Sequence, residues 1–147
     1  MGSHGFLAMI WTLKVLFFIS AAIFVSAFST NKTTRDILDE WRERTKQEHP
    51  ECLKSTGVKQ EYVDQYWESV QMADDENFKC FLWCVFNGFK VINNDGTGNE
   101  ELIVQTIDRM TNEIVEFCME KADKMPDKCK RTYELINCCT RYKHAYV

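Results

Sequence analysis

The chain has 147 residues, and its 18 basic against 22 acidic residues give a formal net charge of −4 at pH 7. An acidic chain is poorly suited to nucleic acid, whose phosphates bind clusters of lysine and arginine. The two signs of charge are also interspersed, without the like-charged block that marks a tail or a binding patch. The charge therefore indicates solvated helix surfaces and says little else about function.

The N-terminal segment has the order of a secretory signal peptide. The start MIWTLK is followed by the apolar run VLFFISAAIFVSA and then by the polar FSTNKTTRD. Val25 and Ala27 stand where small residues precede a cleavage site, so we predict a signal peptide over 1–27 and a single domain over 28–147. A membrane anchor is the alternative, but the uninterrupted apolar run is shorter than the ~20 residues that cross a bilayer.

Residues 28–147 predict an all-α domain, because apolar residues recur three and four positions apart and no run alternates with period two. In chain order, we predict a helix through 36–47 capped by Thr34, a break at Pro50, a short segment over 51–57 and helices over 61–70 and 76–92. A loop at 93–98 follows, then helices over 99–110 and 111–123, a break at Pro126 and a last helix over 127–142.

The helix over 76–92 is predicted to be the central element of the domain. On a helical wheel its apolar residues form one broad face, which consists of Phe78, Phe81, Leu82, Val85, Phe86, Phe89 and Ile92. A helix that is apolar over more than half of its circumference must be surrounded by other elements. Cys80 and Cys84 lie on the flank of this face, and Trp83 falls on the polar side.

All seven cysteines lie in the predicted domain: Cys52, Cys80, Cys84, Cys118, Cys129, Cys138 and Cys139. In a secreted chain of this length they indicate disulfides, with one cysteine left over. Cys80 and Cys84 cannot pair with each other, because Cβ atoms at that helical spacing are ~5–6 Å apart and a disulfide needs ~3.8 Å. A zinc site would need further paired ligands, and a redox site an exposed Cys-x-x-Cys. We therefore expect both to anchor the helix to other elements.

The spacing Cys52-x27-Cys80-x3-Cys84-x33-Cys118-x10-Cys129-x8-Cys138 resembles that of the insect odorant-binding proteins, the pheromone and general odorant-binding group. The x3 and x8 gaps are its specific part, and the segment ECLKSTGV is also similar. The resemblance implies a compact bundle of about six helices around an apolar cavity, stapled by three disulfides. The implied pairs are Cys52–Cys84, Cys80–Cys129 and Cys118–Cys138.

Cys139 departs from this pattern and is expected to be a free thiol. Its neighbour Cys138 fits the x8 gap better. Replacement of Cys138 in the bridge and a link between two chains are the alternatives.

The resemblance also implies a function. The chain would be a secreted, extracellular carrier that binds small hydrophobic odorants or pheromones in its cavity and transports them through aqueous lymph, with an odorant receptor as a candidate partner and a monomeric or homodimeric state. The expected ligand-binding residues lie on inward helix faces and are Phe78, Leu82, Val85, Phe86, Phe89, Met110, Ile114, Phe117, Tyr133 and Ile136. Tyr133 is the expected polar contact. A secreted helical signalling or interaction protein without a cavity is the alternative function.

No enzyme, cofactor or metal site is predicted. The sequence lacks the zinc-protease, nucleophile and phosphate-loop motifs, and Cys138-Cys139 is not followed by the histidine that a secreted phospholipase would need. The loop at 93–98 fails the register of a calcium loop.

Two further features concern the ends of the domain. Asn31 begins a glycosylation sequon and is a candidate for modification. Tyr142, Tyr146 and Val147 could form a lid on the cavity that His144 releases in acid, with a solvated His144 as the plainer alternative.

Overall fold

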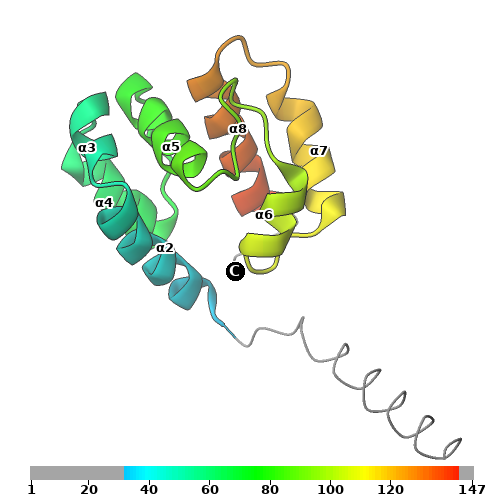
Figure 1. Cartoon of the computed structure of the whole chain (residues 1–147), viewed down its shortest axis with the longest axis horizontal. Coiled ribbons are helices and arrows are strands. Elements are labelled where there is room, and N and C mark those ends of the chain that lie inside the picture. The colour runs from blue at the N-terminus through cyan, green and yellow to red at the C-terminus, as the bar shows by residue number, and fades with distance from the viewer. Residues whose placement is uncertain (1–31, 143–147) are drawn as a thin grey trace, which may run out of the picture. The chain divides into compact units, whose positions relative to one another are not determined.

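The computed structural model describes residues 32–142, and its helices carry the labels of Figure 1. They are α2 (Thr34–Glu48), α3 (Glu51–Thr56), α4 (Gln60–Ser69), α5 (Glu76–Gly88), α6 (Glu100–Thr106), α7 (Asn112–Ala122) and α8 (Lys128–Arg141). Within these residues the only β-type pairing is an isolated bridge between Ile92 and Gly98. The prediction of an all-α domain is thus confirmed, with α3 as a helix of its own.

The signal peptide predicted over 1–27, the sequon at Asn31 and the residues 143–147, which include His144, lie outside the described residues. Those expectations stay predictions. Of the helices described, none has the length and apolar character needed to cross a bilayer.

Short polar side chains start most of the helices. Thr33, not the predicted Thr34, caps α2, because its hydroxyl accepts from the backbone N–H of Asp36 while the Asp36 carboxylate accepts from the Thr33 N–H. Asp75, Asn99, Thr111 and Asp127 cap the four helices from α5 to α8, each with a side-chain oxygen that accepts from a backbone N–H of the first turn. These local signals mark where five of the seven described helices begin.

Helix α5 is the centre of the fold, as its sequence predicts. In Figure 1 it lies between α2, α3 and α4 on one side and α6, α7 and α8 on the other, and its main packing partners are α8 and α3. Phe78, Leu82 and Val85 are completely buried on its apolar face. The helix provides the surface on which the two groups of helices pack.

The prediction that this helix continues to Ile92 is wrong. The helix ends at Gly88, and Lys90 then adopts a left-handed backbone conformation with φ of 65°. The Asn87 side chain donates to the Ile92 carbonyl at 2.9 Å, which stabilises the reversal. As a result Val91 and Ile92 are buried beside the helix rather than at its end.

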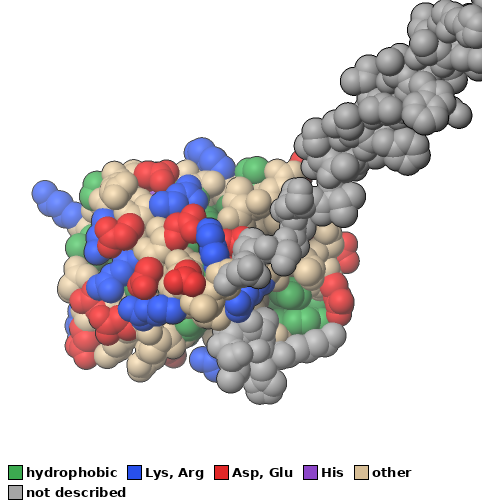
Figure 2. Space-filling view, turned by 90° about the horizontal axis from the view of Figure 1, so that it is seen from below, with side chains coloured by type: hydrophobic (Ala, Val, Ile, Leu, Met, Phe, Trp, Pro, Cys, Tyr) green, Lys and Arg blue, Asp and Glu red, His purple; other side chains and the backbone are tan. Residues whose placement is uncertain are grey.

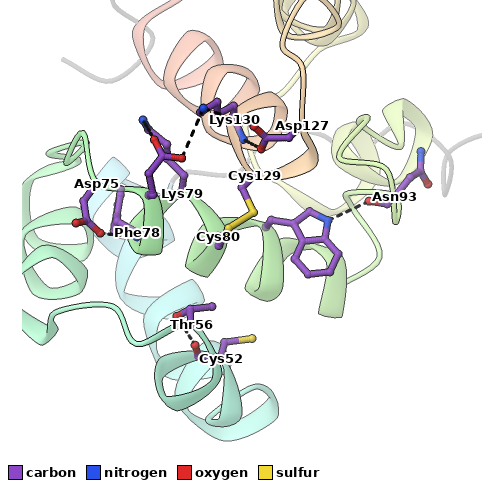
Figure 3. Close-up of a disulfide and its surroundings, with 12 residues drawn as sticks. Cys52, Thr56, Asp75, Phe78, Lys79, Cys80, Asn93, Asp127, Cys129 and Lys130 are labelled. Atoms are coloured by element: carbon purple, nitrogen blue, oxygen red, sulfur yellow. Dashed lines mark hydrogen bonds and ion pairs between the residues drawn. A yellow bond between two sulfur atoms is a disulfide. The ribbon is translucent and has the colours of Figure 1, made fainter.

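Three disulfides join the helices in the pairs that the resemblance implies. Cys52–Cys84 links α3 to α5, Cys80–Cys129 links α5 to α8, and Cys118–Cys138 links α7 to α8, with Cα atoms 5.7, 4.6 and 5.5 Å apart. Figure 3 shows the Cys80–Cys129 bridge crossing from the central helix to the last one. Of the described helices, α2, α4 and α6 take part in none of these three disulfides.

Trp83, on the polar side of α5, is explained by the loop and helix that follow it. Its indole N–H donates to the Asn93 carbonyl at 3.4 Å, and the Lys128 ammonium lies 3.4 Å from the centroid of its ring. The loop is held from the other side by Arg131, which donates to the Asp95 carbonyl at 2.7 Å. Trp83 therefore joins α5 to the 93–98 loop and to the start of α8.

Candidate ligand pocket

The described residues enclose an apolar pocket between the two groups of helices. Its volume is about 80 Å³. It is lined by Ile37, Leu38, Trp41, Tyr66, Trp67, Val70, Phe86, Val91, Ile92, Ile103, Ile107, Met110, Leu135, Ile136, Cys139 and Thr140. These residues come from α2, α4, α5, the turn after α5, α6 and the segment after it, and α8, so the pocket exists only when all of these elements are assembled.

The helical period explains how α2 and α4 supply a wall. In α2, Trp41 follows Ile37 by four residues and Leu38 by three. At the end of α4, Val70 follows Tyr66 and Trp67 at the same intervals. Residues at these intervals lie on one face of a helix. Each helix thus presents one aliphatic and aromatic stripe to the pocket.

The rim of the pocket differs from its interior. Leu38, Val70, Ile107 and Thr140 are partly exposed, whereas most other lining residues are buried. Val70 ends α4 in a left-handed conformation with φ of 55°, so the chain turns away there. These four residues are the part of the lining that solvent reaches most.

Thr140 brings a hydroxyl to the rim. Its Oγ1 donates to the Ile136 carbonyl at 2.9 Å and lies 3.1 Å from the Asn137 carbonyl. Because the hydroxyl proton is used within α8, the oxygen has only lone pairs to offer to a ligand. It can accept a hydrogen bond from an alcohol but has no proton for a carbonyl oxygen.

Cys139 contributes its thiol to the same wall. The side chain is buried and unbridged, and burial raises the pKa of the thiol to about 12. A thiol of this kind packs as a small apolar group and is a poor nucleophile.

Three of the residues expected to contact a ligand, Phe86, Met110 and Ile136, line this pocket. Phe78, Leu82 and Val85 are instead completely buried among core side chains. Phe89 packs its ring edge against Trp41, at 5.0 Å between centroids, and lies outside the lining. The role of all of these residues in ligand binding stays a prediction.

The other three residues expected to contact a ligand, Ile114, Phe117 and Tyr133, also lie outside the pocket lining. Ile114 packs partly buried at the start of α7, and Phe117 is 43% exposed and meets the Tyr142 ring edge-to-face, with centroids 5.1 Å apart. The Tyr133 hydroxyl donates to the Met72 carbonyl at 3.4 Å, and its ring faces the Lys79 ammonium. Tyr133 lies outside the pocket lining, in which Tyr66 and Thr140 are the residues that carry hydroxyls.

Most of the lining was not identified from the sequence. The stripes of α2 and α4 carry a periodic signal that could have been read as two further inward faces. Val91 carries no such signal, and Ile92 was assigned to the apolar face of a helix that in fact ends at Gly88. The turn after α5 directs both residues inward.

The described residues hold no group of three or more histidine, cysteine, aspartate or glutamate side chains that could bind a metal ion. The side chains of the pocket are largely hydrocarbon, and their polar groups are the hydroxyls of Tyr66 and Thr140, the thiol of Cys139 and the indole N–H groups of Trp41 and Trp67. Such a lining can bind an apolar molecule by removing its surface from water and by matching its shape, as ligand pockets commonly do.

Two comparisons with known proteins bear on this pocket. The model of the PBP/GOBP family matches residues 34–142. The general odorant-binding protein 69a of Drosophila melanogaster is 28% identical over 91 residues, which are 59% of this chain and 60% of that protein. The matched family segment contains every residue of the pocket lining.

Proposed function

Because this chain belongs to the PBP/GOBP family, we propose that it is a secreted carrier that holds a small hydrophobic odorant or pheromone in the pocket described above. Members of this family bind ligands and are not enzymes, so no catalytic step is involved. In the proposal the carrier moves its ligand through aqueous lymph and delivers it to an odorant receptor.

The apolar pocket is the observation that carries this proposal. Its walls come from helices on both sides of α5, and the bridges from α5 to α3 and to α8 hold those sides together. A small domain that relied on packing alone would fill such a space, whereas covalent staples stabilise the fold without that packing. The disulfides also support secretion, since such bonds persist in oxidising compartments outside the cytosol.

The pocket as it stands is smaller than most odorants, so binding requires that it widen. An apolar cavity of about 150 Å³ holds benzene, and this pocket measures about 80 Å³. Side chains must therefore move apart to admit an odorant of larger size. Met110 is suited to such a movement, because an unbranched thioether side chain adapts to irregular spaces.

The Thr140 hydroxyl favours an alcohol over an aldehyde or ketone of the same carbon skeleton. An alcohol can donate to the free lone pairs of Thr140 Oγ1, while a carbonyl ligand would find no donor at that oxygen. A hydrogen bond of this kind contributes about 1 kcal/mol, a preference of roughly fivefold.

The test is a fluorescence titration of the oxidised protein with N-phenyl-1-naphthylamine, followed by displacement with matched alcohols, aldehydes and esters. We expect saturable binding, displacement at micromolar ligand and a preference for alcohols. Leu38→Trp should fill the rim and weaken binding at least tenfold. Leu102→Trp, at a partly buried leucine outside the lining, serves as the matched control.

A folded, correctly bridged protein that binds no apolar probe would contradict the carrier function. That result would favour the alternative, a secreted helical interaction protein whose partner is another protein.

A further inference from the structure

A second pocket lies on the other side of Trp67 from the first. Its volume is about 210 Å³. It is lined by Arg42, Thr45, Lys46, His49, Pro50, Leu53, Gln60, Val63, Asp64, Trp67 and Phe81, from α2, α3, α4 and α5. Trp67 is the one residue that the two linings share. The second pocket is therefore a separate space with its own opening.

The floor and the mouth of this pocket have opposite character. Val63, Trp67 and Phe81 form a buried apolar floor. Leu53, at the edge, is 37% exposed, one of the few large apolar side chains of the described residues that reach solvent to this degree. The mouth carries the polar ends of Arg42 and Lys46. A molecule that fits both regions must have an apolar part and a polar head.

The charges at the mouth select the sign of that head. Arg42 and Lys46 line the pocket against a single carboxylate, Asp64, and the His49 imidazole adds ring nitrogens. The other carboxylates that these groups contact, those of Glu43, Glu51 and Glu68, are not part of the lining. The pocket itself thus presents more positive than negative charge.

The existing ion pairs do not block an incoming anion. The Lys46 ammonium lies 2.7 Å from Glu43, but both side chains are more than half exposed, and such pairs contribute little to stability. The Arg42 Nη2 atom lies 3.2 Å from Asp64 Oδ1. Its Nη1 atom lies 4.0 Å from Glu68 Oε1, which is the outer limit for an ion pair. A ligand carboxylate can replace these solvent-exposed partners while its hydrocarbon part leaves water.

We propose that this second pocket binds a small amphiphile with an anionic head, of the medium-chain carboxylate class, with its head at Arg42 and Lys46 and its chain against Val63, Trp67 and Phe81. The site is distinct from the first pocket, with which it shares Trp67, and does not require that the proposed carrier function be correct.

The test is an NMR titration of the ¹³C-methyl-labelled, oxidised protein with sodium octanoate. We expect saturable shifts of the Leu53 and Val63 methyl groups, which line only the second pocket. These shifts should occur at lower octanoate concentration than those of Ile103 and Ile107, which line only the first. Binding should weaken as salt is raised, because salt screens the exposed charges. 1-Octanol, which has the same chain without the charge, should shift Leu53 and Val63 less.

Lys46→Gln and Arg42→Gln should each weaken octanoate binding at this site about fivefold or more. Lys54→Gln, which removes an exposed lysine outside the lining, is the matched control and should leave it unchanged. Shifts confined to Ile103 and Ile107, or equal affinity in wild type and Lys46→Gln, would overturn the proposal. Naphthylamine binding in the same samples reports on the odorant pocket, so failure of one site is distinguished from failure of the other.

Discussion

Cys138 and Cys139 are neighbours in α8, yet one is bonded to Cys118 of α7 and the other is a free thiol in the wall of the apolar pocket. Successive residues of an α-helix are rotated by about 100°. The two thiols therefore face different parts of the fold, and only that of Cys138 reaches a partner cysteine.

The buried thiol should react slowly in the native protein. With a pKa of about 12, only about one Cys139 in ten thousand is ionised at pH 8, and the thiolate is the reactive form. We expect iodoacetamide to label native protein at least about a hundredfold more slowly than protein unfolded in urea without reductant. Rapid stoichiometric labelling of the folded chain would contradict the burial, and Cys139→Ser should show no labelling in either state.

The bridges should differ in how much they stabilise the fold. The Cys80–Cys129 bridge spans 49 residues and the Cys118–Cys138 bridge spans 20. Loop entropy in the unfolded chain then predicts a loss of about 4 kcal/mol when the first pair is replaced by alanines and about 3 kcal/mol for the second. Urea unfolding of the two double variants measures both free energies of unfolding. A larger loss for the Cys118–Cys138 pair would show that loop length does not determine how much each bridge stabilises the fold.

Gly96 should tolerate alanine much less well than Gly57. Both adopt positive φ, +88° and +65°, so both substitutions carry the strain of about 1–2 kcal/mol for a left-handed residue with a side chain. A Cβ on Gly57 would meet nothing closer than 3.7 Å, whereas one on Gly96 would lie 2.5 Å from the backbone carbonyl oxygen of Lys128.

Because that backbone begins α8, it cannot move aside cheaply. Urea unfolding should therefore show a larger destabilisation for Gly96→Ala than for Gly57→Ala. Equal losses would mean that the close approach of the loop to Lys128 contributes nothing.

The contact between Asp74 and Lys79 should make stability depend on pH in acid. The Asp74 carboxylate accepts from the Lys79 ammonium at 2.5 Å, and this hydrogen bond together with the charge of Lys79 lowers the pKa of Asp74 below 3.8. A carboxyl whose pKa is lowered by folding stabilises the native state above its unfolded pKa, and this stabilisation is lost as the pH falls through the folded value.

Asp74→Asn should therefore reduce the free energy of unfolding at pH 7 but not at pH 2, measured by urea unfolding at both. Asp39→Asn is the control, because its partner Arg35 is about half exposed, whereas Lys79, the partner of Asp74, is only 11% exposed. A deficit in Asp74→Asn that persists unchanged at pH 2 would exclude the ion pair as its cause.

The sequence by itself determined the helical architecture and its central element. Apolar residues at helical spacing and breaks at Pro50 and Pro126 are signals that act over a few residues, so they can be read without knowledge of the rest of the chain. The cysteine spacing added the family resemblance, and with it the disulfide pairs.

The pocket was decided by the tertiary structure. A helical wheel shows that Phe78 and Phe86 share the apolar face of α5, but not that Phe78 meets core side chains and Phe86 borders a pocket. That difference depends on which helices pack at each end of α5 and on the turn at Lys90, which directs Val91 and Ile92 inward. Local spacing fixes the direction of a side chain on its own helix, whereas the space in front of it depends on residues far away in the sequence.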